Sequence, residues 1–361
     1  MAKKFLDLNI SENKMENFIE EVETIIVGGG QVGLSVGRYL KEQGRQFIIL
    51  EKNESIGLSW KNRYDSMQLD SFAKYSQLEG FPFPGDPMRH AKKDEVVVYL
   101  QSFAKNYNIN PQFSTEVSSI EKEKDEFIVK TNRGVYRARF IVLATGPFQK
   151  AYIPKSAGNI SKDIYQIHSN DYKNPAQLKE GPTLVVGAGN SGAEIVEELL
   201  EFGKVVFFSY KRKLKSIKSN FFSQWLAYRL GLAHVPRGSL LGKIIIWYTK
   251  GKPVGVDVNK LLKNPHLTSV PEFKGEVPKN AKENIRNIIW ATGYESDFSI
   301  ISIPDFNPDS QKRGITNISN LFILNIRWQY SKSSSHLAGV SRDAKYIANY
   351  IIDKAKNEIL S

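Results

Sequence analysis

Short runs of apolar and β-branched residues alternate with longer amphipathic stretches along this chain. Residues 24–27 and 183–186 each predict a short buried strand, and each run leads into a helical pattern, over residues 34–43 and 193–202. Strands that alternate with helices form mostly parallel sheets. The pattern therefore predicts an α/β fold with two Rossmann-like dinucleotide-binding domains.

Both strand–helix junctions carry three glycines in the spacing G-x-G-x-x-G, 159 residues apart. The first glycine makes the turn, the second lets a pyrophosphate approach the backbone, and the third lets helix and strand pack closely. The helix N-terminus adds free N–H groups and a positive dipole end. The expected contact residues are Gly28, Gly30, Gln31, Val32 and Gly33 at the first turn, and Gly187, Gly189, Asn190, Ser191 and Gly192 at the second.

An acid follows the first turn at the distance expected for ribose recognition. The run 46–50 predicts the second strand, and Glu51 ends it, 23 residues beyond Gly28. A carboxylate there accepts hydrogen bonds from two ribose hydroxyls and repels a 2′-phosphate. We expect FAD at this site; a solvated glutamate at a strand end is the alternative.

Cations take the place of that acid after the second turn. The matching offset falls on Tyr210, and Lys211 and Arg212 follow it. Because cations favour a 2′-phosphate, the second site is expected to prefer NADPH over NADH. A basic surface loop is the alternative interpretation.

Two apolar runs end in the same tripeptide, each downstream of its own glycine turn. We expect both tripeptides to lie near a bound cofactor: Ala144, Thr145 and Gly146 after one run, and Ala291, Thr292 and Gly293 after the other.

This order implies that one dinucleotide unit interrupts the other. We expect an FAD-binding domain at 21–165 and 286–361, completed by a strand at 321–324 and a helix at 343–355. The remaining predicted segments are an N-terminal extension at 1–20 and an NADPH-binding domain at 166–285 with an aromatic-rich insert at 214–270.

Composition limits the class of protein. No apolar stretch approaches the length of a transmembrane helix, no signal-peptide pattern is expected at the N-terminus, and the chain has no cysteine, so we expect a cytoplasmic protein. The net charge of +12 comes with scattered lysines and no nucleic-acid module. Anionic cofactors or a membrane surface are therefore the expected partners of this charge, rather than nucleic acid.

Several motifs carry a resemblance to a known family. They include Gly57-Leu-Ser-Trp60, Arg63-Tyr-Asp-Ser66, Phe81-Pro-Phe-Pro84, Ala144–Gln149 and the closing Gly339-Val-Ser-Arg-Asp-Ala344. Together they resemble the class B flavin-dependent monooxygenases: flavin-containing monooxygenases, plant YUCCA enzymes and bacterial flavoproteins associated with cation-diffusion facilitators. The resemblance covers about residues 22–355 and further implies flavin contacts from Lys52, Ser59, Trp60, Leu69 and Val117.

The chain departs from the family pattern at two places. Of the signature Phe-x-Gly-x-x-x-His-x-x-x-Tyr it keeps His168 and Tyr172, but Lys162 and Ile164 replace the Phe and Gly. Asp70 stands where flavin-containing monooxygenases have an asparagine beside the flavin.

The resemblance implies a mechanism in which NADPH reduces FAD and O₂ then gives a C4a-(hydro)peroxyflavin. That species would transfer one oxygen atom to a small organic substrate, and no metal or protein nucleophile is required. The catalytic candidates are Asp70 and His168, with a plain loop carboxylate and a structural, cofactor-positioning histidine as the alternatives. Trp60 is alternatively an ordinary core aromatic.

Rival functions remain. The reduced flavin of an NAD(P)H oxidase or quinone reductase inserts no oxygen, and an accessory redox-sensing flavoprotein has negligible turnover. A disulfide reductase is excluded because there is no cysteine. The aromatic-rich stretch 221–248 is expected to pack on the NADPH-binding domain, to line a substrate tunnel or to touch a membrane surface. The substrate and the oligomeric state stay open.

Overall fold

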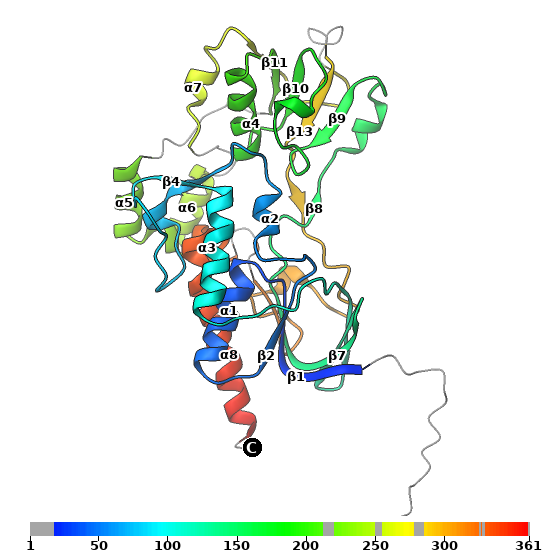
Figure 1. Cartoon of the computed structure of the whole chain (residues 1–361), viewed down its shortest axis with the longest axis vertical. Helices are drawn as coiled ribbons and strands as arrows, with labels where there is room; N and C mark the ends of the chain where they lie inside the picture. Colours follow the sequence, from blue (N-terminus) through cyan, green and yellow to red (C-terminus); the bar gives the residue numbers. More distant parts are fainter. Residues whose placement is uncertain are drawn as a thin grey trace, which may run out of the picture.

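A computed structural model describes residues 18–211, 220–249, 255–277, 285–324, 326 and 329–359 of the chain. Two separate sheets organise these residues, one below the other in Figure 1. We call them, with the helices that cover them, the first unit and the second unit.

The first unit is built on a six-stranded sheet in the order β2-β1-β7-β6-β5, with β15 also paired to β7. β1, β2 and β15 run parallel to their partners, whereas β5, β6 and β7 form an antiparallel meander. The strand bounds are β1 Phe18–Val27, β2 Phe47–Leu50, β5 Val117–Glu123, β6 Glu126–Thr131, β7 Gly134–Leu143 and β15 Leu321–Ile323.

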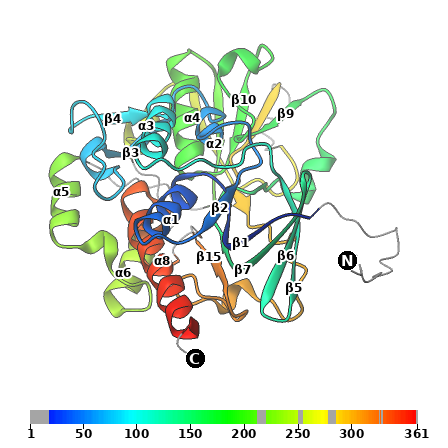
Figure 2. The ribbon, with the colours of Figure 1, turned by 60° about the horizontal axis from the view of Figure 1, so that its bottom comes forward.

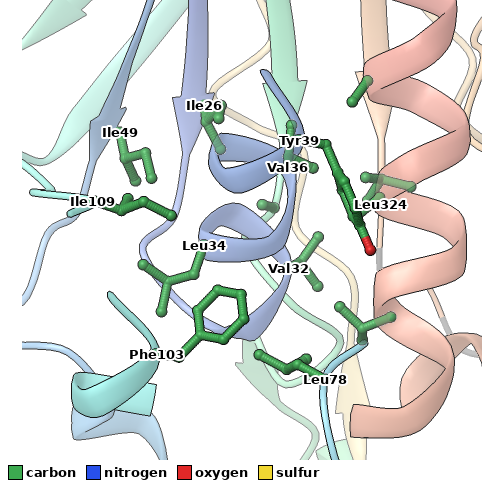
Figure 3. Close-up of a cluster of buried hydrophobic side chains, with 14 of the residues drawn as sticks. Ile26, Val32, Leu34, Val36, Tyr39, Ile49, Leu78, Phe103, Ile109 and Leu324 are labelled. Carbon is green, nitrogen blue, oxygen red and sulfur yellow. The ribbon is translucent and has the colours of Figure 1, made fainter. Parts of the chain in front are cut away.

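Three helices cover one face of this sheet and enclose the main core (Figure 2). They are α1 (Gln31–Glu42), α3 (Lys93–Asn106) and α8 (Leu337–Ile359). Apolar residues recur along α1 at helical spacing, and Figure 3 shows Tyr39 beside α8 and Leu34 pointing toward Phe103. Burying this stripe fixes the start of α1 against the end of β1, where the first glycine turn lies.

The second unit has a five-stranded parallel sheet in the order β12-β11-β10-β13-β9. Every residue of its central strands is buried, as is typical of a parallel sheet covered on both faces. The bounds are β9 Tyr165–His168, β10 Thr183–Val186, β11 Val206–Ser209, β12 Leu267–Val270 and β13 Asn287–Trp290, with helices α4 Asn190–Glu201 and α7 Val258–Leu261.

The chain passes between the units along a two-stranded antiparallel ribbon. It consists of β8 (Lys150–Ala151) and β14 (Tyr294–Glu295). Smaller elements complete the fold: α2 Leu58–Lys61, β3 Gln68–Phe72, β4 His90–Lys92, α5 Phe221–Arg229 and α6 Leu240–Thr249, with 3₁₀ turns η1 Ala73–Tyr75, η2 Lys155–Asn159, η3 Pro175–Gln177, η4 Leu232–His234, η5 Pro308–Ser310 and η6 Lys332–Ser335.

The structure corrects three expected boundaries. β13 pairs with β10 and β9, so the chain leaves the second sheet after residue 290 and not at 286. β1 begins at Phe18, inside the expected extension 1–20, because it pairs along the full length of β7. The last helix is also longer than 343–355, since it packs along α1.

The aromatic-rich stretch lies on the first unit and not on the second, as one expectation had it. Tyr228 of α5 stacks on Tyr75, with ring centroids 4.5 Å apart and 12° between the planes. Phe221 packs edge-on against Phe72, and the backbone N–H of Arg237 donates to the Tyr330 carbonyl at 2.7 Å. These contacts join α5 and the segment after it to β3, η1 and the loop before η6.

Candidate cofactor and active site

The first glycine turn is closed by contacts that leave no room for a side chain. Gly28 has a φ of +110°, and a Cβ there would lie 2.6 Å from the Ala144 carbonyl oxygen. A Cβ on Gly33 would lie 1.9 Å from the Gly28 carbonyl oxygen, so only glycine lets α1 begin this close to β1. Around Gly30, by contrast, a Cβ would meet nothing within 4 Å. That space beside the start of α1 is the right place for a phosphate group.

The second turn repeats this construction. Gly187 has a φ of +106°, and a Cβ there would lie 2.3 Å from the Ala291 carbonyl oxygen. A Cβ on Gly192 would lie 1.9 Å from the Gly187 carbonyl oxygen, whereas Gly189 again faces open space. The structure thus builds two cradles of the same shape, and in each an Ala-Thr-Gly turn lies against the first glycine.

Those two tripeptides occupy equivalent places. The Ala144 N–H donates to the Val27 carbonyl and the Ala291 N–H to the Val186 carbonyl, both at 2.8 Å. Each tripeptide ends in a glycine of positive φ, +81° for Gly146 and +89° for Gly293. The threonines bind the residues on either side of β8, since Gln149 donates to Thr145 and Thr292 donates to the Tyr152 carbonyl.

Glu51 lies beside the first turn, held by the backbone. One carboxylate oxygen accepts a hydrogen bond from the Gly29 N–H at 2.6 Å, and the other accepts from the Asn53 N–H at 2.9 Å. The side chain is buried at the carboxyl end of β2, which is where a parallel sheet presents ligand-binding groups. This arrangement fits an adenosine ribose next to the cradle.

At the equivalent place in the second unit there is no acid. β11 ends at Ser209, and the Tyr210 hydroxyl donates to the Ser269 hydroxyl at 3.0 Å. The Lys211 side chain is largely exposed and pairs with Glu272 at 3.5 Å. Arg212 lies outside the described residues, so its place stays a prediction.

Arg63 is a site residue that the sequence named only as part of a family motif, with no role predicted for it. It comes from the first unit just after α2 and is buried, yet its guanidinium reaches the second cradle. One Nη donates to the Tyr294 hydroxyl at 2.8 Å, and the other lies 3.5 Å from the Ser191 hydroxyl at the start of α4. Its Nε has no hydrogen-bond partner among the described residues. A buried cation with an unsatisfied donor beside a helix N-terminus fits an anionic ligand.

Asp70 also lies at the second cradle. The Asn190 side-chain amide donates to its carboxylate, although Asp70 belongs to β3 of the first unit. Burial, together with the nearby charge of Glu194, raises the pKa of Asp70 to about 7, and Lys332 opposes this shift. Burial also raises the pKa of Glu194, whose carboxylate accepts a hydrogen bond from the Tyr64 hydroxyl. A carboxyl of this kind can hold or release a proton at neutral pH.

His168, the other catalytic candidate, is fully engaged in structural contacts. Its Nδ1 accepts from the Asn170 N–H at 3.0 Å, and its Nε2 lies 3.1 Å from the Gly293 carbonyl, which requires a proton on Nε2. Burial lowers the pKa of this imidazole, so it is neutral at pH 7. Tyr172 is likewise buried and donates to Glu198 at 2.6 Å. These contacts give His168 a positioning role at the Gly293 turn and leave no free ring nitrogen for a base.

Of the residues expected from the resemblance, Trp60 contacts the first cradle, since its indole N–H donates to the Gln31 side chain at 3.2 Å. Leu69 lies on β3, and its carbonyl lies 2.7 Å from a ring nitrogen of His90. Of the others, Lys52 and Ser59 are exposed, and Val117 packs in the core under the meander. Val32, which was expected at the first glycine turn, packs in the core of the first unit.

A separate cavity of about 510 Å³ lies between η1, η4 and α8. Tyr75, Tyr228, His234 and Arg342 line parts of it, and none of the predicted site residues does.

Comparison with known proteins places the chain in a family. The profile of the pyridine nucleotide-disulphide oxidoreductases matches residues 25–234. An uncharacterised CzcO-like oxidoreductase of Geobacillus kaustophilus is 38% identical, over 92% of this chain and 99% of its own length. The chain belongs to the pyridine nucleotide-disulphide oxidoreductase family. It is a flavin-dependent oxidoreductase, and its resemblance to the class B flavin-dependent monooxygenases is confirmed.

Two further similarities agree with this. A probable indole-3-pyruvate monooxygenase, YUCCA3 of Arabidopsis thaliana, is 28% identical over 92% of this chain and 87% of its own. The structure of a flavin-containing monooxygenase from Stenotrophomonas maltophilia has a TM-score of 0.75 at 21% identity, covering 93% of this chain and all of that one. The predicted cofactor pair, FAD and a nicotinamide dinucleotide, is confirmed for the family. Within the described residues, no helix has the length and apolarity to cross a bilayer.

Proposed function

We propose that this protein is an NADPH-dependent FAD monooxygenase that inserts one oxygen atom from O₂ into a small organic substrate in the cytoplasm. The observation that carries the proposal is the composite second cradle. Arg63 and Asp70 of the first unit both contact the start of α4 in the second unit. Two dinucleotides seated in the two cradles would therefore meet at the place where these residues lie.

The first cradle fits the adenine half of FAD. Gly28, Gly30 and Gly33 would hold the pyrophosphate against the N-terminus of α1, and Glu51 would accept hydrogen bonds from the ribose. Trp60 and Gln31, joined by their hydrogen bond, would border the path from the pyrophosphate toward the second unit.

The second cradle fits NADPH. Gly187, Gly189 and Gly192 would hold its pyrophosphate at the N-terminus of α4, with Ser191 at the first turn of the helix. Arg63 would supply a buried positive charge to that phosphate through the donor that now lacks a partner. Lys211 and Arg212 would bind the 2′-phosphate, since the exposed pairing of Lys211 with Glu272 is weak and easily replaced.

The bound cofactors would supply the redox chemistry: hydride transfer from nicotinamide to flavin, and activation of O₂ by the reduced flavin. The protein's part is to position the two ring systems, to exclude water and to control one proton. Asp70 is the residue suited to the last task, because its pKa of about 7 lets its carboxyl oxygen hold a proton at neutral pH. The neutral imidazole of His168 holds the Gly293 turn in place.

One observation favours a second candidate, an NADPH oxidase that releases hydrogen peroxide. A protonated carboxyl at Asp70 can donate a proton where the amide of the resembling monooxygenases cannot. If Asp70 gave up its proton before oxygen transfer to the substrate, the oxygen would leave as hydrogen peroxide.

A rapid-mixing experiment separates the two functions. The NADPH-reduced enzyme is mixed with O₂, with and without NADP⁺, in the presence of a sulfide, an amine or a ketone as probe. A monooxygenase delays the return of oxidised-flavin absorbance when NADP⁺ is present and forms oxygenated product in step with NADPH consumption. Immediate return of that absorbance with stoichiometric hydrogen peroxide would instead identify an oxidase. A purified protein that neither carries nor takes up FAD would overturn both proposals.

A further inference from the structure

Helices α5 and α6 turn apolar side chains toward solvent. On α5 these are Phe222, Trp225, Leu226 and Leu230, the last at its C-terminal end, and on α6 they are Leu240, Leu241, Ile244, Trp247 and Tyr248. We call these nine residues the apolar face. Trp247 and Leu240 are the most open, at 80% and 78% of full exposure.

The spacing of the apolar face is that of a buried helix stripe. On α5 it follows i, i+3, i+4 and i+8, and on α6 i, i+1, i+4, i+7 and i+8, so each set occupies one side of its helix. A stripe like this normally packs into a core. Here it faces outward, and an exposed patch of this kind marks an interaction site.

The inward sides of this region are already engaged. Tyr228 stacks on Tyr75, and its hydroxyl donates to the Tyr75 carbonyl at 3.1 Å. The Gln224 side chain donates to the Asp70 carbonyl at 3.0 Å. Both ribbon views place α5 and α6 on the same outer side of the first unit, near α8 (Figures 1 and 2). The helices are therefore anchored to the first unit through their inward sides, and the apolar face stays outside its core.

The segment of the sequence that contains these helices carries charge of one sign. Residues 202–256 contain eleven lysines and arginines and no aspartate or glutamate. The rest of the chain holds 39 basic and 38 acidic residues, so this segment accounts for nearly the whole net charge of +12. Among its described cations, Arg229, Arg237 and Lys243 are exposed and lie on or between the two helices. Such a surface attracts anions and repels a second copy of itself.

We propose that the apolar face and its cations dock the protein on an anionic lipid bilayer. Tryptophan, tyrosine and phenylalanine beside lysine and arginine are the residues that membrane interfaces favour. The helices are too short to span a bilayer and would lie in its surface. The proposal does not depend on which cofactor fills which cradle.

Vesicle co-sedimentation of the flavin-loaded protein tests this. The probes are vesicles of phosphatidylcholine alone and of phosphatidylcholine with about one third phosphatidylglycerol. We expect binding to the anionic vesicles only, and weaker binding at higher ionic strength. Equal binding to both vesicle types, or to neither, overturns the proposal.

Variants assign the binding to the face. Leu240→Ser with Trp247→Ser should weaken vesicle binding by about ten-fold or more, and Arg229→Glu with Lys243→Glu should abolish the preference for anionic lipid. Phe202→Ser is the matched control, because Phe202 is 65% exposed and directly follows α4 in the second unit, away from the face, so this variant should bind like the unmodified protein. Unchanged flavin absorbance in each variant shows that the fold is kept.

Two results would assign the face differently. If Leu240→Ser with Trp247→Ser leaves vesicle binding intact, the apolar face is not the lipid contact. If size measurement in solution shows a dimer that this variant dissociates, the face is an interface between copies and the lipid proposal is wrong.

Discussion

At the first glycine turn, a buried carboxylate stands next to the backbone cradle, whereas at the second turn the equivalent place has no acid and is followed by cations. The cradles themselves are alike: the first and third glycines of each are closed by the same backbone contacts, and the middle glycine of each faces open space. Backbone shape thus defines a place for a dinucleotide, and the flanking side chains decide which dinucleotide it suits.

The two cradles also differ in where their contacts originate. Glu51 reaches the first cradle from the same sheet, because it follows β2, which pairs directly with β1. The second cradle depends on Arg63 and Asp70, which come from the other unit. Changes at the first cradle should therefore affect one ligand, while changes at the second should also alter how the units meet.

Filling the open space at one middle glycine should weaken the binding of one cofactor and spare the binding of the other. Because a Cβ at Gly30 meets no protein atom, Gly30→Ala should fold but should bind FAD at least about ten-fold more weakly, through loss of phosphate approach. Gly189→Ala should keep its yellow colour and lose NADPH affinity to a similar degree. Flavin content and NADPH titration measure the two effects.

Gly158→Ala is the control, since Gly158 also faces open space but lies in η2, outside both cradles. Normal FAD affinity in Gly30→Ala would contradict the assignment of the first cradle.

Removing Lys211 and Arg212 should reduce the difference in affinity between NADPH and NADH. Lys211→Ala with Arg212→Ala should weaken NADPH binding by about ten-fold and leave NADH binding nearly unchanged, because only NADPH carries the 2′-phosphate. Stability should change little, since the Lys211–Glu272 pair is exposed. Equilibrium titration with both cofactors decides this, with Lys263→Ala as an exposed control on the same unit. Equal losses for NADPH and NADH would refute the phosphate pocket.

Asp70 should give the protein a dependence of stability on pH. Burial raises its pKa to about 7 in the folded state, above the value of an unfolded aspartate. The contribution is therefore fully present below about pH 4 and is lost as pH rises through about 7. Asp70→Asn should not lose this contribution. Between pH 4 and 8, its free energy of unfolding should therefore rise relative to that of the unmodified protein by on the order of 1–4 kcal/mol.

Denaturant unfolding across that pH range provides the measurement, and Asp309→Asn, at an exposed carboxylate of η5, is the control. Parallel pH profiles for Asp70→Asn and the unmodified protein would show that Asp70 does not titrate in this range.

The smallest effect is expected at His168. Burial lowers its pKa, so its contribution to stability is present above the ordinary histidine value and is lost as pH falls through the folded pKa. His168→Asn should cost about 1–2 kcal/mol through the lost contact with the Gly293 carbonyl. The pH profile of NADPH oxidation above pH 7 should keep its shape. Disappearance of a titration step from that profile would make His168 a base after all.

Local patterns predicted the parts of the molecule that local physics determines. The run at 183–186 matches β10, and both sets of glycines lie at their strand–helix junctions, because adjacent residues determine turn geometry and the burial pattern. The placement of Arg63 was not predictable in this way. No neighbouring residue in the sequence indicates that Arg63 is buried, or that it contacts Ser191, which lies 128 residues further along the chain.

The same limit explains the errors. β13 was assigned to the first unit because its strand pattern does not tell which sheet it joins, and pairing with β10 decides that. The stretch 221–248 was expected on the second unit because it follows that unit in sequence, but stacking of Tyr228 on Tyr75 places it on the first. Partners distant in the chain determine both outcomes.

The ribbon of β8 and β14 carries a consequence for motion. Since β8 and β14 join the two units, a rotation of one unit against the other would bend the chain at these paired segments. Tyr294, which receives a hydrogen bond from Arg63, belongs to this pivot. A rotation wide enough to admit or release a nicotinamide would therefore disturb the hydrogen bond between Arg63 and Tyr294. Opening of the molecule would in this way be coupled to the positive charge that would bind its ligand.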